Sequence, residues 1–132
     1  MKLIKISPNT EMAKNILNMI SLLEERIKSQ NPIKMTALII SDYYEISKEL
    51  ITAILLVDGY KTLSHKDLIE YIAQKYKEFS QFEISILHKL RVLRNRVAYE
   101  GFLIDHSYLD RNEIVFKSII EKLKKFLKDK LS

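Results

Sequence analysis

Only two glycines and two prolines interrupt the 132 residues of this chain. These two residue types break helices most strongly, so their scarcity favours helical structure almost throughout. No segment shows the alternation of apolar and polar residues that is typical of a strand of ordinary length. We therefore predict an all-α fold without strands. No repeat, low-complexity tract or linker divides the chain, which predicts a single domain over residues 1–132.

Capping residues and apolar periodicity predict the helix boundaries. Asn9 or Thr10 caps the first helix, and Asn31-Pro32 is typical of an N-cap followed by proline at the first helical position. Gly59 and Gly101 are suited to end the second and fourth helices in a left-handed conformation. The expected helices are 9–30, 31–57, 64–79, 80–100 and a last one that begins near 106. Because helices of this length joined by short loops pack antiparallel, we predict an up-and-down bundle of four to five helices.

Apolar residues make up 47% of the chain and charged residues 30%, a balance typical of globular proteins. The second helix is apolar on more than one face, which predicts a central helix or one that also packs against a second subunit. The last helix is expected to direct a set of apolar residues inward: Leu109, Val115, Phe116, Ile119, Ile120, Leu123, Phe126 and Leu127.

The net charge of +5 permits anionic partners without requiring them. Without cysteine the chain has no disulfide and no thiolate metal site, and no His or carboxylate cluster has convincing metal-ligand spacing. We expect no metal and no cofactor. The N-terminal residues do not resemble a signal peptide, and no apolar run is long enough for a membrane span, so we expect a cytoplasmic protein without a membrane partner.

The fourth helix carries the most informative segment. On a helical wheel, Ile86, Leu90, Leu93 and Val97 share one side, which predicts the core stripe. Four residues of another kind share a different side, with Arg94 beside them: His88, Arg91, Asn95 and Tyr99.

Arginine, asparagine and tyrosine together suit a nucleotide or an RNA phosphate. The planar guanidinium binds phosphate with paired hydrogen bonds, an amide reads a base edge or a ribose hydroxyl, and a phenol ring stacks on a base. The predicted binding residues are His88, Arg91, Arg94, Asn95, Arg96 and Tyr99. In the alternative interpretation the arginines only compensate the helix dipole, Asn95 bonds a neighbouring helix, and Tyr99 lies at the rim of the core.

Two segments resemble the HEPN family of helical domains. The first comprises the long second helix, the turn at Gly59, and the pair Ser64-His65 that opens the next helix. The second is residues 93–99, Leu-Arg-Asn-Arg-Val-Ala-Tyr, which is similar to the family's motif of Arg, a polar residue, three further residues and His. The resemblance covers about residues 34–127.

The resemblance implies a bundle of four or five helices that is usually dimeric. In active members, the Arg-to-His helix ends of two subunits form one metal-independent ribonuclease site. Many members are toxins encoded beside a minimal nucleotidyltransferase, and others only bind nucleic acid or nucleotide. The motif places Arg94, Asn95 and Tyr99 at the family's catalytic positions.

The chain departs from the family at Tyr99, which stands where active members have His. Imidazole titrates near ~6.5 and phenol near ~10, so phenol is a poor proton carrier at neutral pH. His88 and His106 lie outside the motif position, and His65 is expected to be structural. We therefore expect an RNA- or nucleotide-binding homodimer with weak or no nuclease activity, in a toxin–antitoxin-like pair. The alternatives are a metal-independent ribonuclease toxin and a structural partner of a minimal nucleotidyltransferase.

Overall fold

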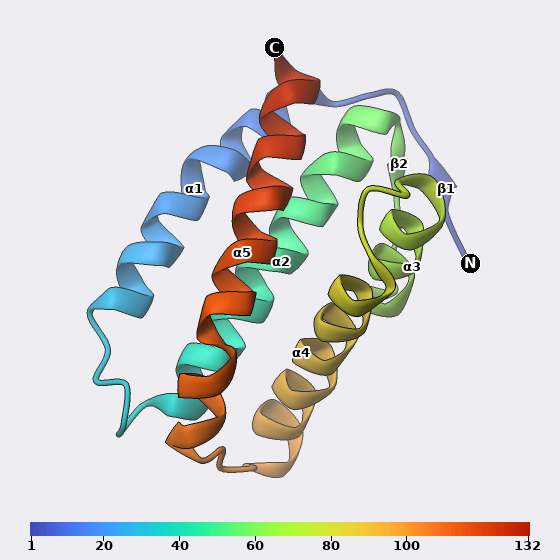
Figure 1. The fold of residues 1–132 in the computed structure, drawn as a ribbon. Helices are drawn as coiled ribbons and strands as arrows, with labels where there is room; N and C mark the ends of the chain where they lie inside the picture. The colour runs from blue at the N-terminus through green and yellow to red at the C-terminus, as the bar shows by residue number, and fades with distance from the viewer.

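Five helices and one very short sheet form the fold of the computed structural model, which describes all residues from 1 to 132 (Figure 1). The helices are α1 (Thr10–Lys28), α2 (Thr36–Asp58), α3 (His65–Lys75), α4 (Gln81–Glu100) and α5 (His106–Leu131). Strand β1 (Ile4–Lys5) pairs antiparallel with β2 (Tyr60–Lys61). The predicted all-α class is confirmed. None of the helices is both long and apolar enough to cross a membrane.

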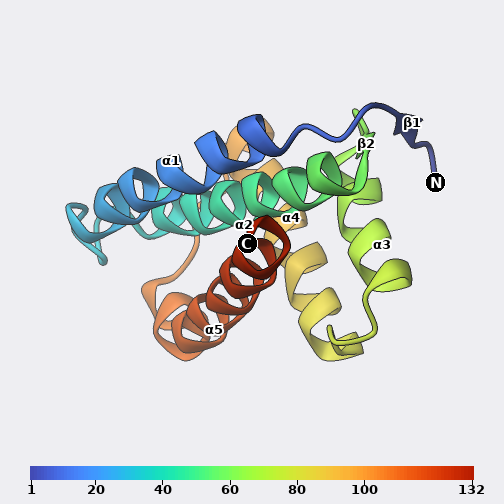
Figure 2. The same ribbon diagram turned by 90° about the horizontal axis from the view of Figure 1, so that it is seen from above.

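Helix α2 lies at the centre of the bundle, as its broad apolar surface predicts. It packs against each of the other four helices. Viewed from above, α1 runs along one side of α2, α5 lies on the other side, and α4 crosses behind α2 (Figure 2). Most of its side chains are buried, and Ile46, Leu50 and Ile54 have no exposed surface. The polar residues on this helix are therefore either buried or only partly exposed.

Predicted caps define both ends of α4. The Ser80 hydroxyl accepts from the Glu83 N–H, and the Glu83 carboxylate accepts from the Ser80 N–H, which completes a capping box. Gly101 ends the helix with a φ of 62°. Asn9, Ser64 and Asp105 cap α1, α3 and α5 through their side chains. Local sequence signals thus fix the helix that carries the candidate site.

Three boundary predictions are wrong. Helix α2 begins at Thr36 rather than near Pro32, because Asn31 caps a separate turn that ends at Met35 with a non-helical ψ of 24°. Helix α3 ends at Lys75 rather than near Phe79, because Tyr76 is extended and its hydroxyl donates to Asp58. Helix α1 ends at Lys28, two residues before the predicted end. The two strands were not predicted, since two residues are too few for an alternation pattern.

The core largely matches the predicted stripes. On α4, Ile86 and Leu90 are buried and Leu93 packs partly against the core, whereas Val97 remains half-buried. Leu87 is also buried, although its side of the helix was not assigned to the core. All the inward residues predicted for α5 are either buried or packed against the core.

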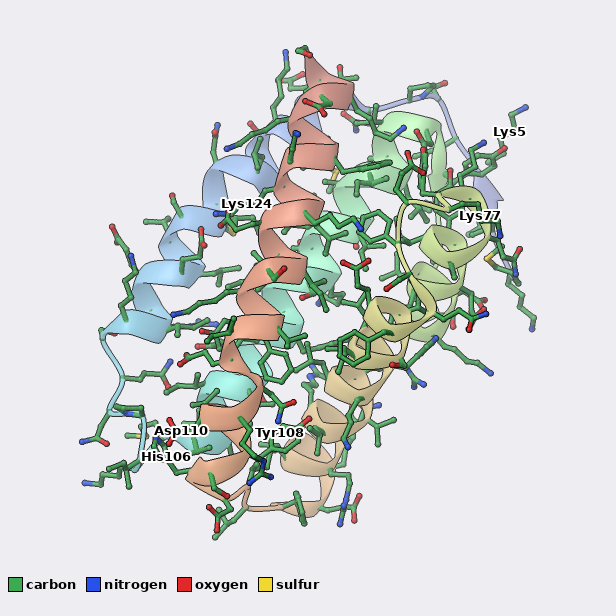
Figure 3. All side chains as sticks on the ribbon, in the orientation of Figure 1. Lys5, Lys77, His106, Tyr108, Asp110 and Lys124 are labelled. Carbon is green, nitrogen blue, oxygen red and sulfur yellow. The ribbon has the colours of Figure 1, made fainter.

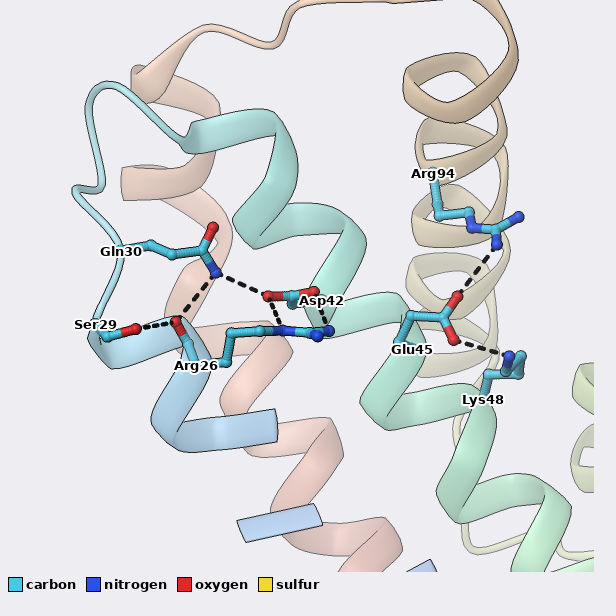
Figure 4. Close-up of polar contacts among 7 residues, drawn as sticks. All are labelled: Arg26, Ser29, Gln30, Asp42, Glu45, Lys48 and Arg94. Atoms are coloured by element: carbon cyan, nitrogen blue, oxygen red, sulfur yellow. Dashed lines mark hydrogen bonds and ion pairs between the residues drawn. The ribbon is translucent and has the colours of Figure 1, made fainter. Parts of the chain in front are cut away.

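Two polar clusters tie the ends of helices together. At the C-terminal end of α2, the Asp58 carboxylate accepts from Tyr71 (2.7 Å), Tyr76 and Lys130 (2.7 Å). At the other end, Arg26 donates two hydrogen bonds to Asp42, at 2.8 and 3.1 Å, and so joins α1 to α2 (Figure 4). Bidentate pairs of this kind fix both distance and orientation.

The two glycine caps give a matched stability test. Both adopt a positive φ, but a Cβ at Gly59 would lie 3.1 Å from the Ile6 carbonyl oxygen, whereas one at Gly101 would meet nothing within 4 Å. We expect Gly101→Ala to lower the free energy of unfolding by about 1 kcal/mol, and Gly59→Ala by about 2 kcal/mol or more. Urea unfolding measures both values. Equal losses of unfolding free energy would show that the backbone at Ile6 moves away from the new methyl group at no measurable cost.

Candidate nucleic-acid interface

Six polar residues from three helices meet where α4 faces α2. We call them the three-helix cluster, and it comprises Tyr44, Glu45, Lys48, His65, Arg91 and Arg94. Helix α2 supplies the first three, the first residue of α3 supplies His65, and α4 supplies the two arginines. The His65 and Tyr44 rings lie 6.1 Å apart between centroids. The cluster therefore joins part of the predicted site to residues that lie far from it in the sequence.

One carboxylate in this cluster, that of Glu45, forms ion pairs with two cations. The Glu45 Oε1 atom lies 3.3 Å from Arg94 Nη2, and its Oε2 atom lies 2.8 Å from Lys48 Nζ (Figure 4). Lys48 also lies 3.4 Å from Glu49. The second terminal nitrogen of Arg94 donates only a long bond, 3.3 Å, to the Asn95 side-chain oxygen. Arg94 therefore makes no bidentate pair, and the hydrogen-bond donors of its guanidinium group are only partly paired.

Two hydrogen-bond donors in the cluster have no acceptor. The Arg91 Nε–H and the Tyr44 hydroxyl are both buried without a partner, and Arg91 forms no ion pair. Most buried polar groups in proteins are hydrogen-bonded, and an unpaired one costs stability. The Arg91 Nε–H can only donate and the Tyr44 hydroxyl can donate as well as accept, so an acceptor would satisfy both groups. The cluster thus combines an excess of positive charge with buried hydrogen-bond donors that lack an acceptor. These are the features of an anion-binding site.

The charges of the cluster influence its titratable groups. Burial raises the pKa of the Tyr44 phenol to about 12, although the nearby charges of Arg91 and Arg94 oppose this rise. Burial also lowers the pKa of His65 below its ordinary value, and the charges of Lys48 and Arg94 lower it further. His65 is therefore neutral at neutral pH. Its ring adds hydrogen-bonding capacity to the cluster without adding charge.

His88 lies apart from the cluster and faces α3. Its Nε2 atom is 3.0 Å from Glu70, while its buried Nδ1 atom has no partner. It therefore bridges α3 and α4. Tyr99 is eleven residues further along, which corresponds to roughly 16 Å along the helix axis. The structure does not bring these two predicted site residues together.

The last turn of α4 presents the remaining predicted residues. The Arg96 guanidinium lies 3.7 Å from the centre of the Phe102 ring and 3.8 Å from the Glu100 carboxylate. Tyr99 is 77% exposed, and its hydroxyl has no hydrogen-bond partner within the chain. His106, at the start of α5, pairs with Asp110 at 3.5 Å (Figure 3). Tyr99 is thus the most accessible aromatic group of the predicted site.

Sequence reasoning missed the partners that α2 and α3 contribute. A signal for them exists, because polar residues recur along one side of the largely apolar α2 at spacings of four, three and four: Ser41, Glu45, Lys48 and Thr52. All four are half-buried, as expected for a stripe that faces a neighbouring helix. Residues of α4 three apart, Arg91 and Arg94, lie opposite this stripe.

A pocket of about 510 Å³ opens elsewhere, between α1, α2 and α5. The Tyr43 hydroxyl donates a hydrogen bond of 2.6 Å to Glu113 there, and burial together with this carboxylate raises the pKa of the phenol. No residue of the three-helix cluster lines this pocket. No group of three or more His or carboxylate side chains is placed to hold a metal ion.

Comparison with known proteins identifies no relative: no protein-family model, no curated protein and no solved structure matches this chain. Functional inference therefore depends on the residues themselves.

Proposed function

We propose that the protein binds RNA or a nucleotide through phosphate groups, and that its surface for this purpose is α4 together with the facing side of α2. The observation that carries the proposal is the buried Arg91 Nε–H without an acceptor, close to Arg94, whose guanidinium donors are only partly paired. Arginine binds phosphate with a fixed charge and a planar set of donors. At the exposed end of the same helix, Tyr99 offers an accessible ring on which a base can stack.

The nuclease activity is proposed to be weak or absent. Ribonucleolytic attack by a 2′-hydroxyl requires a group that moves a proton near neutral pH. At the motif position the chain has a phenol rather than an imidazole. His88 and His106 are both engaged with carboxylates, Glu70 and Asp110. The phenol at the motif position supports binding as the function rather than cleavage.

The resemblance to HEPN domains extends this proposal to partners. We propose a HEPN-like bundle that forms a homodimer in the cytoplasm and is paired with a minimal nucleotidyltransferase in a toxin–antitoxin-like system. The observed helical bundle is compatible with this arrangement. Size-exclusion chromatography with light scattering measures the oligomeric state directly.

Binding is tested by titrating a fluorescein-labelled single-stranded RNA with the protein at several salt concentrations. The logarithm of the association constant is expected to fall linearly with the logarithm of salt concentration, by ~0.7 per phosphate contact. Arg91→Ala is expected to weaken binding about tenfold, because hydrogen bonds to charged groups contribute about 1.5–3 kcal/mol.

Arg111→Ala is the matched control, since Arg111 is exposed on α5 and forms no ion pair. It removes the same charge from a residue outside the three-helix cluster and is expected to change the affinity less than twofold. Equal weakening by the two variants would indicate attraction by net charge alone. Absence of binding at low salt, to RNA and to ATP alike, would refute the proposed function.

A further inference from the structure

We propose that the three-helix cluster is a phosphate subsite in which the Glu45 carboxylate occupies the place of the phosphate until RNA or a nucleotide displaces it. This inference rests on the proposed function and adds to it two contributors, Lys48 and His65, and an internal competitor. Neither the helical wheel of α4 nor its motif assigns a role to Glu45.

The position of Glu45 supports this interpretation. Its two oxygens bridge Arg94 Nη2 (3.3 Å) and Lys48 Nζ (2.8 Å), so the carboxylate sits between two cations as a phosphate would (Figure 4). A carboxylate and a phosphate share this mode of recognition by arginine. The side chains of Glu45, Lys48 and Arg94 are 26%, 18% and 24% exposed, so the bridge lies at the surface of the bundle within reach of a ligand.

Glu45 nevertheless fills the subsite incompletely. It reaches neither the Arg91 Nε–H nor the Tyr44 hydroxyl, both of which remain without an acceptor. A phosphate monoester, as in a nucleotide or at a phosphorylated RNA end, has three acceptor oxygens and nearly two negative charges, more than a carboxylate. It therefore has oxygens available for donors that Glu45 leaves unpaired. This mismatch is the reason that a phosphate is expected to compete successfully with a side chain that is already in place.

Charge balance leads to the same conclusion. Lys48, Arg91 and Arg94 contribute three positive charges, while Glu45 and Glu49 contribute two negative charges. His65 is neutral, as its lowered pKa indicates. When Glu45 moves into solvent, the local excess of positive charge increases from one to two. An excess of two matches the charge of a phosphate monoester, which approaches two negative charges at neutral pH.

The proposal is tested by replacing Glu45 with Gln, which keeps the shape of the side chain and removes its charge. Glu49→Gln is the matched control, because Glu49 contacts only Lys48, at 3.4 Å, and not Arg94. With the labelled single-stranded RNA as probe, Glu45→Gln is expected to tighten binding about three- to tenfold. Glu49→Gln, which changes the net charge equally, is expected to tighten it less than twofold.

Lys48→Ala, introduced into the Glu45→Gln protein, is expected to remove the gain, whereas Lys125→Ala on the exposed face of α5 is expected to preserve it. Thermal unfolding of each variant verifies that it is folded. Competition by ATP and by inorganic phosphate distinguishes a nucleotide subsite from one that requires the RNA chain.

The outcomes separate this inference from the proposed function. Binding by the wild type with equal effects of Glu45→Gln and Glu49→Gln would overturn the competitor role while leaving RNA binding intact. Binding only by the Glu45→Gln protein would refute phosphate binding by the wild type, and with it the displacement of Glu45 by a ligand. Absence of binding by every variant would overturn both proposals.

Discussion

Replacing Asp58 with Ala is expected to lower the free energy of unfolding by about 3 kcal/mol. Asp58 accepts from Tyr71, Tyr76 and Lys130, so its carboxylate connects the end of α2 to α3, to the residue after it and to α5. The side chains of Asp58 and Lys130 are only 12% and 22% exposed. Truncation would leave an ammonium and two phenols without their acceptor in a poorly solvated place.

The stability lost in Asp58→Ala should depend on pH. Burial alone would raise the pKa of Asp58, but hydrogen bonds from Lys130, Tyr76 and Tyr71 together outweigh it and hold this pKa below its ordinary value. A carboxyl whose folded pKa is depressed stabilises the fold above its unfolded pKa, near ~3.9, and loses that contribution as pH falls through the folded value. The difference between wild type and variant should therefore be constant near neutral pH and shrink below about pH 4.

Asp129→Ala is the matched control, because Asp129 is an exposed carboxylate on α5 and forms no ion pair. Thermal unfolding compares the midpoint temperatures of the two variants directly. Asp58→Ala should lower the midpoint by roughly 10 °C, and Asp129→Ala by at most about 2 °C. Similar midpoints for the two would show that the tyrosines and the lysine find other partners, and that Asp58 does not hold the helix ends together.

How much of the fold the sequence predicts depends on whether a feature is local. The capping box of Ser80 and Glu83 and the left-handed caps at Gly59 and Gly101 are encoded within a few residues, and all of them were predicted correctly. The end of α3 was not, because Tyr76 leaves the helix to reach Asp58, a residue eighteen positions earlier. No local pattern contains that contact.

In the candidate site, too, the local features were predicted and the contacts between distant residues were not. Arg91 and Arg94 were found because both lie on one helix, where spacing determines which side chains are neighbours. Their partners Glu45 and His65 lie on other helices, and the wheel of α4 contains no information about what faces it. The polar stripe on α2 indicates a facing surface, but only the packed structure pairs Glu45 with Arg94.

Tyr99→His is expected to raise RNA cleavage at neutral pH by about 100-fold over the wild type. The substitution places an imidazole at the position where active members of the HEPN family, whose motif residues 93–99 resemble, have histidine. Imidazole, with a pKa near ~6.5, exchanges a proton readily at neutral pH, whereas a phenol near ~10 does not. Tyr99 is 77% exposed, so the replacement should leave the fold intact. Gel electrophoresis of labelled RNA after incubation in EDTA measures cleavage without metal.

Ala98→His is the matched control for this gain of function. Ala98 is also exposed in the last turn of α4, but its side chain projects about 100° around the helix from that of Tyr99. Ala98→His therefore adds the same imidazole on a different side of the helix from position 99, and it should not produce cleavage. Adding Arg94→Ala to Tyr99→His should abolish the new activity, because a guanidinium is needed to hold the scissile phosphate. Cleavage that persists in this double variant would reveal a contaminating nuclease. Equal inactivity of the two histidine variants would mean that the motif resemblance does not extend to catalytic geometry, and that this helix end serves binding alone.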